Sequence, residues 1–577
     1  MINDQYILGL NCAYHESSVC IIKNGRIISF MQEERLNRIK HAKPANIDNS
    51  DVLPLKSINY CLKAANISIK DISHIGYNLN PAKHKQKNDA HVHPYKPTHG
   101  DFGTKEGEEI FYKKNLNVEK KMRKFGFHGK FYYLNHHDCH AAGAYFSSGY
   151  KSAAILVIDG IAEFESTTWY RGSGTSLKKI DSIDFPNSLG FLWEKFSKYL
   201  GFSEYDASKV MGLTSYGDPA IYRKKFQELV KIKQDGTFTV DDSIIQFRNE
   251  DYSKLEKLFG LKRNKKNIRH VDKTNQKYAD LGATLQEATE KILLNLIKDI
   301  QKKTGLKSLC MAGGVALNCV ANAKLIYSNI FEKIYIQPPA DDAGGAIGAA
   351  FFVSTQILKQ KRPKAVKHAY LGPKYSEKEI FSALKKSDIK CKKVRYIEKE
   401  TAKLLASGKL VAWFQDRMEV GPRALGHRSI LSDPRNKNAL DLINEKVKLR
   451  EPFRPLCPSF LEEQVKKWID VGKSKDIPDP AYYMLIAFNA KPGKKKLIPA
   501  VVHVDNTSRI QVVNKKTSPK YWKLINEFFK LTKVPVVMNT SFNIQEPIVC
   551  SPEDAIKTFK RSKIDYLVMG NYLCEKI

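Results

Sequence analysis

Two histidines one helical turn apart, and an aspartate at the end of an apolar strand, form the first group of residues able to do chemistry. His136 and His140 lie four positions apart and share one face if the segment is helical. Asp159 follows the apolar run Ala-Ile-Leu-Val-Ile and precedes a glycine. Imidazoles and carboxylates bind divalent transition metals, and three such ligands leave a position open for a substrate. The spacing alone leaves a helix with exposed histidines as an equally good interpretation.

Arginines embedded among glycine, proline and apolar residues form a second group. The stretch Gly-Pro-Arg423-Ala-Leu-Gly-His-Arg-Ser is followed by further basic and polar residues, namely Lys446, Lys448, Arg450, Arg454, Arg509, Ser541 and Asn543. Guanidinium groups bind phosphate oxygens in pairs, and lysine adds a mobile charge. We therefore expect a pocket for a polyphosphate or acyl phosphate, in preference to surface arginines paired with acids.

The elements that must position these residues show a duplicated pattern. Residues 6–11 predict a strand, and residues 18–30 predict a hairpin with an Asn24-Gly25 turn. A similar pair recurs at 153–159 and 167–172. This duplication fits the actin-like, sugar-kinase type of fold, in which two related halves enclose a nucleotide.

Glycine pairs follow two further predicted elements. An amphipathic helix is expected over 281–303, and a strand from Ser308 runs into Gly313 and Gly314 before another helix. The turn containing Asp341 and Asp342 likewise leads into a helix of small residues. Such junctions bring backbone N–H groups close to phosphate or ribose oxygens.

A change in composition over 359–376 predicts a linker between two domains, 1–358 and 377–577. Beyond it, residues 410–414, 534–538 and 564–569 read as strands between helices, which indicates a second α/β domain.

Length, cysteine usage and charge narrow the class of protein. At 577 residues the chain is too long for one hydrophobic core. The ten cysteines include no Cys-x-x-Cys pair, which argues against a disulfide scaffold and predicts reduced, mostly buried thiols. Neither a membrane span nor a signal peptide is indicated, so a cytoplasmic location is expected. The net charge of +34 is spread along the chain and indicates a lysine-rich solvated surface more than a basic face for an anionic partner.

Six short motifs follow one another along nearly the whole chain. They are Asn-Cys-Ala-Tyr-His-Glu-Ser-Ser from Asn11, the His-His-x-x-His block, Lys209-Val-Met-Gly-Leu-Thr-Ser-Tyr-Gly, Gly313-Gly-Val-Ala-Leu-Asn, Asp342-Ala-Gly-Gly-Ala-Ile-Gly, and Gly421-Pro-Arg-Ala-Leu-Gly-His-Arg-Ser. In this combination they resemble the NodU/CmcH family of O-carbamoyltransferases. The resemblance implies an α/β enzyme with an N-terminal duplicated actin-like (ASKHA) domain and a C-terminal YrdC-like α/β domain. In that family the second domain makes carbamoyl-adenylate from carbamoyl phosphate and ATP, and the first passes the carbamoyl group to a hydroxyl.

The resemblance also implies roles for individual residues. The metal ligands are His136, His140, Asp159 and Asp342, holding iron(II), although the spacing suits zinc equally. The resemblance implies that carbamoyl phosphate and the nucleotide are bound by Arg423, Lys448, Arg454, Arg509 and Ser541. Of these, Arg423 and Lys448 are expected to be catalytic. Mg²⁺ is expected to accompany ATP. Lys209, Gly313, Gly314 and Asn318 match further positions that surround the nucleotide in that family. His15, at the polar tip after the first strand, is the expected general base, and a histidine that only caps the strand is the alternative.

The acceptor is expected to be a hydroxyl of a sugar, glycan or natural product, with residues 78–124 contributing to its pocket. Contact with an anionic membrane-linked substrate and assembly as a homodimer are left open, and no nucleic acid is expected. A tRNA-modifying threonylcarbamoyl-type transferase is the main alternative, since the chain is strongly basic. A carbamoyltransferase of hydrogenase maturation is disfavoured because the sequence lacks Cys-x-x-Cys zinc motifs and an acylphosphatase segment. An ATP-binding regulator of the actin-like class is a third, non-enzymatic option.

Overall fold

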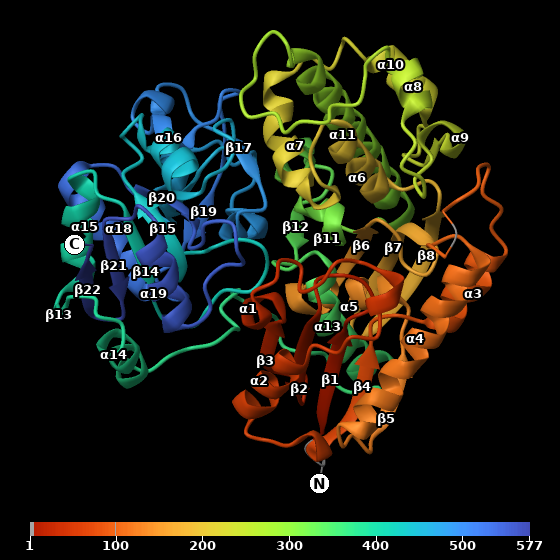
Figure 1. Ribbon diagram of the computed structural model, residues 1–577, viewed down its shortest axis with the longest axis horizontal. Coiled ribbons are helices and arrows are strands. Elements are labelled where there is room, and N and C mark those ends of the chain that lie inside the picture. Colours follow the sequence, from red (N-terminus) through yellow and green to blue (C-terminus); the bar gives the residue numbers. More distant parts are fainter. Residues whose placement is uncertain (1–4, 99, 577) are drawn as a thin grey trace. The chain divides into compact units, whose positions relative to one another are not determined.

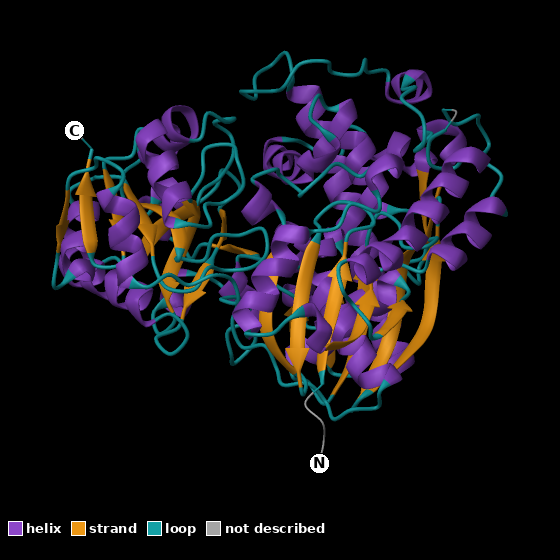
Figure 2. Ribbon diagram, turned by 60° about the horizontal axis from the view of Figure 1, so that its bottom comes forward, coloured by secondary structure: helices purple, strands orange, loops and turns teal. Residues whose placement is uncertain are grey.

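The computed structural model describes residues 5–98 and 100–576, which divide into two compact units, 1–366 and 367–577. Helices flank strands in each unit, so the fold is mixed α/β (Figure 2). The backbone N–H groups of Lys364 and Val366 donate to Gly25 and Ser147 of the first unit. Residues 359–366 therefore run along the first unit, and the division falls within the segment 359–376.

Two five-stranded sheets of the first unit share one strand order and one set of strand directions. In the first, β1 pairs antiparallel with β2, β2 with β3, and the parallel strands β4 and β5 follow on the other side of β1. In the second, β6, β7, β8, β11 and β12 repeat that arrangement. The strands are β1 (Tyr6–Asn11), β2 (Ser18–Lys23), β3 (Arg26–Gln32), β4 (Ile72–Tyr77), β5 (Lys130–Tyr133), β6 (Ser152–Ile158), β7 (Glu165–Ser173), β8 (Ser176–Asp184), β11 (Ser308–Ala312) and β12 (Lys333–Ile336). The predicted duplication is confirmed.

The first hairpin turns where the sequence predicts it. Asn24 and Gly25 have φ values of 50° and 71°. Two consecutive positive φ values define the type I′ turn, whose twist matches that of the strands it joins. The Asn-Gly pair supplies the two residue types that tolerate this backbone.

The two sheets are connected through a pair of packed helices. The helix α13 (Gly345–Phe352) packs on β1, β2 and β4, while α5 (His136–Ser148) packs on β6 and β11, and the two helices contact each other (Figure 1). A Cβ atom added to Gly348 would lie 1.7 Å from the carbonyl oxygen of Cys139. Only glycine permits this approach of the two helix backbones.

The remaining helices of the first unit cover the outer faces and carry the loops. They are α1 (Glu34–Asn37), α2 (Leu55–Ala65), α3 (Pro81–Asp89), α4 (Lys105–Lys124), α6 (Leu189–Tyr199), α7 (Ala207–Leu213), α8 (Arg223–Leu229), α9 (Asp242–Ile245), α10 (Ser253–Phe259), α11 (Gln276–Thr304) and α12 (Cys319–Ser328), with the small hairpin β9 (Val230–Ile232) and β10 (Phe238–Val240). The helix predicted over 281–303 is confirmed within α11.

The second unit is built on one eight-stranded sheet in the order β13-β22-β21-β14-β15-β20-β16-β19. Its strands are β13 (Cys391–Lys393), β14 (Val411–Phe414), β15 (Arg428–Ser432), β16 (Cys457–Leu461), β19 (Gln511–Val513), β20 (Val536–Ser541), β21 (Tyr566–Met569) and β22 (Tyr572–Glu575), with a separate pair β17 (Ala487–Asn489) and β18 (Thr507–Arg509). Its helices are α14 (Glu377–Lys385), α15 (Ile397–Ala406), α16 (Ala439–Asp441), α17 (Val465–Trp468), α18 (Pro519–Thr532) and α19 (Pro552–Arg561). The expected second α/β unit is confirmed.

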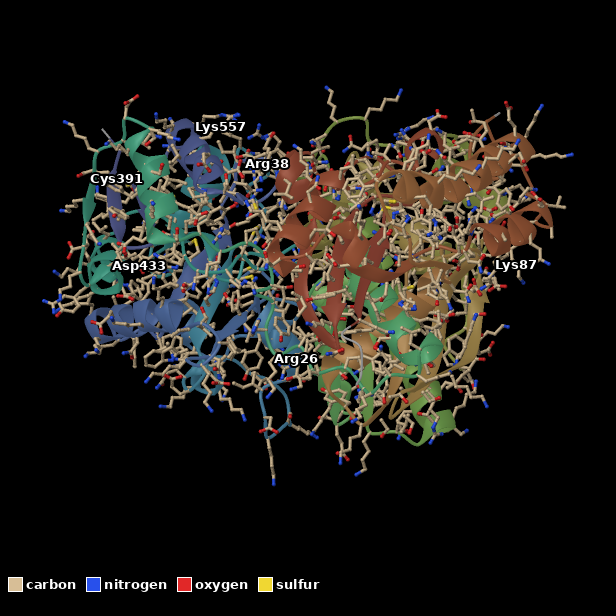
Figure 3. The ribbon with its side chains drawn as sticks, turned by 90° about the horizontal axis from the view of Figure 1, so that it is seen from below. Arg26, Arg38, Lys87, Cys391, Asp433 and Lys557 are labelled. Atoms are coloured by element: carbon tan, nitrogen blue, oxygen red, sulfur yellow. A yellow bond between two sulfur atoms is a disulfide. The ribbon has the colours of Figure 1, made fainter. Side chains whose placement is uncertain are left out.

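The expectation that all cysteines are reduced is wrong for one pair. Cys391 on the edge strand β13 (labelled in Figure 3) forms a disulfide with Cys574 on β22. The two residues are 183 positions apart, but antiparallel pairing places them directly opposite each other. The other eight cysteines are free and buried, as predicted.

Lysines project outward from both units, for example Lys87 from α3 and Lys557 from α19 (Figure 3). Among the residues that the structure describes, no helix combines the length and the apolar composition needed to cross a membrane.

We expect Gly348→Ala to destabilise the first unit, because the added methyl group must separate α5 from α13. Overpacking of this kind costs about 1–3 kcal/mol or more. Gly282→Ala in α11 is the matched control, since its Cβ would meet no atom closer than 3.7 Å and alanine is the better helix former. Scanning calorimetry should show a lower transition temperature for the first variant only. Equal transition temperatures for both variants would show that the two helices are not held at this distance.

Candidate functional site

Four predicted metal ligands converge between the two sheets of the first unit. His136 and His140 occupy the first two turns of α5, Asp159 follows the last residue of β6, and Asp342 opens the short turn before α13. One potential ligand atom from each of the four residues lies within 4.8 Å of the others. The helical placement of the two histidines, one turn apart, is confirmed.

The spacing of the donor atoms fits a single ion. His136 Nε2 lies 3.1 Å from His140 Nε2 and 3.4 Å from Asp342 Oδ1. Asp159 Oδ2 lies 3.2 Å from His140 Nε2 and 3.8 Å from His136 Nε2. Ligands bonded to one transition metal at about 2.1 Å lie roughly 3.0–3.4 Å apart in tetrahedral or octahedral geometry. These four residues can therefore hold one divalent metal ion.

Hydrogen bonding orients the His136 imidazole toward the centre of the group. Its Nδ1 lies 3.2 Å from the carbonyl oxygen of Asn78, which can only accept, so Nδ1 carries the proton and Nε2 presents a lone pair. The neighbouring His137 points away, with its Nδ1 3.0 Å from Thr168 Oγ1 on β7. Only two histidines of the block are thus available as ligands.

The electrostatics of the group balance two acids against two imidazoles. Burial lowers the pKa of His136, but Asp342 and Asp159 outweigh this effect and hold that pKa well above the ordinary histidine value. Burial raises the pKa of Asp159, and the two imidazoles outweigh it and hold that pKa well below its usual range. The buried carboxylates thus require positive charge at their centre, which protons or a metal ion can supply.

The glycine pair after β11 brings the backbone to the same place. Gly313 has φ of 91°, and a Cβ there would lie 2.1 Å from the carbonyl oxygen of Ile158. A Cβ on Gly314 would lie 3.3 Å from Asp159 Oδ1. The predicted junction therefore lies beside Ile158 and Asp159, the second of which belongs to the candidate metal site. Asn318 instead caps α12 and donates to Gln286 Oε1 at 2.8 Å, while Lys209 pairs with Asp206 at 3.0 Å.

A cavity of about 290 Å³ opens onto the two ligating aspartates. Its wall includes His15, as well as His84, Thr98, Asp101 and Phe102 from the predicted acceptor segment 78–124. The His15 ring stands edge-on to Tyr205 with centroids 5.4 Å apart, and its Nδ1 is enclosed without a hydrogen-bond partner in the described part of the chain. His15 is thus placed to contact a molecule in the cavity.

Sequence reasoning missed Glu194, which lines the same cavity from α6. Burial, with smaller contributions from the carboxylates of Asp159 and Glu204, raises the pKa of Glu194 to about 8. A carboxyl group that is protonated near neutral pH in a cavity is a candidate functional group. The sequence around it shows only an amphipathic helix, so no signal identified it.

In the second unit, Lys448 and Ser541 lie together at the end of β20. Lys448 Nζ donates to Ser541 Oγ at 3.1 Å and to Asn543 Oδ1 at 2.6 Å. Ser541 lies across from Ser429 of β15, and Arg423 is half-buried in the loop 415–427 that leads into that strand. The structure thus places Lys448 beside Ser541, with Arg423 on the loop that enters β15, the strand paired with β20.

Arg454 and Arg509 form a cluster with Arg450, which the sequence placed in the basic group without a specific role. Burial lowers the pKa of Arg450 well below its usual value, and the charges of Arg454 and Arg509 lower it further. Arg509 Nε lies 3.1 Å from Cys457 Sγ, and Arg454 lies 3.6 Å from Glu451. Three neighbouring guanidinium groups form a locally basic region, which is a suitable environment for an anion.

Arg428 does not belong to this cluster. It is fully buried, donates to the carbonyl oxygens of Gln415 and His427, and lies 3.7 Å over the ring of Phe414. Its role is to hold the loop before β15 in place.

Relatives of known sequence match most of the chain. An uncharacterized protein of Synechocystis sp. is 37% identical, with 99% of this chain and 97% of that protein covered. Nodulation protein NolNO of Sinorhizobium fredii is 34% identical, with 98% and 80% covered. Nodulation protein NolO of Bradyrhizobium diazoefficiens is 38% identical, with 77% and 79% covered.

Solved structures show a weaker likeness. The (R)-2-hydroxyglutaryl-CoA dehydratase component A of Acidaminococcus fermentans is 16% identical with a TM-score of 0.34, covering 60% of this chain and 97% of that one. HypF of T. kodakarensis is 14% identical with a TM-score of 0.30, covering 62% and 49%.

Family models match both units. The model described as carbamoyltransferase N-terminus matches residues 6–351, and the model described as carbamoyltransferase C-terminus matches residues 402–576. Each match lies wholly within one of the two compact units. The chain is therefore an enzyme of the carbamoyltransferase family, in which its relatives include the nodulation proteins NolO and NolNO.

Proposed function

We propose that this enzyme is an ATP-dependent O-carbamoyltransferase. Its second unit would use water to release phosphate from carbamoyl phosphate and would join the resulting carbamate to ATP, giving carbamoyl-adenylate and pyrophosphate. Its first unit would transfer the carbamoyl group to a hydroxyl, releasing AMP. The observation that carries the proposal is the set of two imidazoles and two carboxylates at the end of a cavity in the first unit.

Within the first unit, His136, His140, Asp159 and Asp342 would hold iron(II) or zinc, both of which accept this donor set. When bound, the ion supplies positive charge for the phosphate of the leaving AMP. We favour iron on the family resemblance. His15, whose Nδ1 is enclosed at the cavity wall, would take the proton of the acceptor hydroxyl.

The remaining nucleotide contacts would come from the glycine junction. Gly313 and Gly314 lie against Asp159, where their backbone can approach a phosphate or ribose. We also propose Lys209 and Asn318 as nucleotide-binding residues on the family resemblance. Lys209 would have to exchange its ion pair with Asp206 for such a contact.

The second unit would carry the activation step. Two anionic reactants must be brought together, and the cluster of Arg450, Arg454 and Arg509 places three guanidinium groups close to one another. We propose that Lys448, Ser541 and Arg423 complete this site and that Mg²⁺ accompanies ATP. We further propose a YrdC-like fold for the second unit on the family resemblance.

The cavity wall supports a hydroxylated acceptor with apolar faces. Aromatic side chains of Tyr14, Phe102, Phe191 and Phe247 line it. Lys198 is paired with Glu250 at 2.5 Å, and Lys195 donates to backbone carbonyl oxygens. Since these lysines are already engaged, the aromatic side chains supply the surface for an acceptor, and we propose a sugar or natural product. Incubation with labelled carbamoyl phosphate, ATP and a panel of hydroxylated compounds, followed by mass detection of a carbamoyl gain, tests the proposal.

We expect His140→Ala to lose the metal of the first unit and to lower carbamoyl transfer by more than about 100-fold, since even loss of an outer partner of a ligand costs about 10- to 100-fold. Metal content measured by mass spectrometry and product formation measured by chromatography check this. The exposed His128→Ala is the matched control and should retain both. A His140→Ala enzyme with full metal content and full transfer would refute the assignment.

We expect the two half-reactions to be separable. Arg454→Ala should abolish most of the pyrophosphate burst that depends on carbamoyl phosphate, because a charge-assisted phosphate contact is lost. His140→Ala should retain that burst. Arg561→Ala, which removes an exposed arginine of α19, is the matched control and should retain it as well. Single-turnover measurement of pyrophosphate distinguishes the variants. If pyrophosphate release by the unaltered enzyme never responds to carbamoyl phosphate, the proposed activation step is wrong.

A further inference from the structure

A second group of potential metal ligands lies in the first unit, apart from the four residues described above. It consists of His91 and His93, in the segment after α3, and Asp242, the first residue of α9. One potential ligand atom from each residue lies within 4.8 Å of the others. Two imidazoles and one carboxylate are a common donor set for divalent transition metals.

The backbone aims both histidines to the same side. Residues 91–98 alternate between half-buried and exposed positions, as an extended segment does, so residues two apart share a side. Val92, between the histidines, is 87% exposed. The segment thus exposes an apolar side chain to solvent while it turns both imidazoles inward.

The inward atoms have no hydrogen-bond partners in the described part of the chain. His91 Nε2, His93 Nδ1 and Asp242 Oδ2 are all enclosed and unbonded. The side chains of His93 and Asp242 are only 7% and 4% exposed. Buried polar atoms without partners are costly, and three of them facing one point indicate a missing partner.

The distances suit an ion better than direct contact. His93 Nδ1 lies 3.9 Å from Asp242 Oδ2, which is too far for a hydrogen bond and somewhat longer than the separation of two ligands of one ion, so a bound ion would draw the two atoms slightly closer. The other oxygen, Asp242 Oδ1, accepts from the backbone N–H of Phe247 at 3.3 Å, which fixes the carboxylate. The rings of Phe164 and Phe185 lie 5.5 and 5.4 Å from His91, and the Arg248 guanidinium lies 5.0 Å from the Phe185 ring.

We propose that His91, His93 and Asp242 bind a second divalent transition-metal ion of the zinc type, with water at the open position. This ion would join the segment after α3 to the first residue of α9. The chain that follows each of these points lines the cavity, through Thr98, Asp101 and Phe102 in the first case and through Phe247 and Arg248 in the second. A hydrogen bond of 2.6 Å from the Arg248 backbone N–H to Tyr95 Oη already links them. The ion would therefore fix the cavity wall without contacting the reacting atoms.

The test measures zinc bound by the full-length protein after equilibrium dialysis. We use the His140→Ala background, in which the first site is disabled, and expect about one equivalent of bound zinc. Asp242→Asn in that background should reduce it to near zero. Asp241→Asn is the matched control, because Asp241 caps α9 through its side chain and asparagine caps equally well. This variant should retain the zinc.

Unchanged zinc content in the Asp242→Asn variant would overturn the proposal. Misfolding of that variant would also remove zinc, so anomalous diffraction at the zinc edge from crystals of the unaltered protein provides a second test. A peak between His91, His93 and Asp242 supports the site, and its absence in zinc-soaked crystals shows that these residues form an ion pair only. Neither measurement depends on carbamoyl transfer, so the outcome is independent of the proposed activity.

Discussion

The close packing of α5 against α13 is the contact on which the first unit depends. Each helix packs on a different sheet. Because Gly348 has no side chain, the backbone of α13 lies close to the carbonyl oxygen of Cys139 in α5. His136 and His140 lie in the first two turns of α5, and Asp342 lies in the short turn that leads into the N-terminus of α13. A contact that joins the two halves of the unit therefore also sets the distances between the metal ligands. Stability and chemistry are coupled at this point.

The buried charged groups of the two units have opposite signs at their candidate sites. In the first, two buried carboxylates face two imidazoles, and a cation at the centre satisfies all four groups. In the second, the charges of Arg454 and Arg509 lower the pKa of the buried Arg450, so three guanidinium groups stand close together. This contrast is what we expect if the first unit binds a cation and the second binds phosphates, as proposed.

Local sequence patterns were sufficient where short-range physics decides the structure. The Asn24-Gly25 turn, the helical spacing of His136 and His140 and the long amphipathic helix α11 were predicted correctly, because turn geometry and side-chain periodicity act within a few residues. The repeat of the strand pattern likewise indicated the duplicated sheets. Family resemblance then added Asp342, which lies more than 180 residues from its neighbouring ligand Asp159.

Long-range contacts decided what the sequence could not. The disulfide between Cys391 and Cys574 depends on strand pairing across 183 residues. Glu194 and the cluster of His91, His93 and Asp242 became visible only when the fold buried them together. By itself the sequence determined the local elements, the family and the four residues of the main candidate metal site. The tertiary structure decided which polar groups are enclosed without partners, because burial and proximity depend on how distant segments pack.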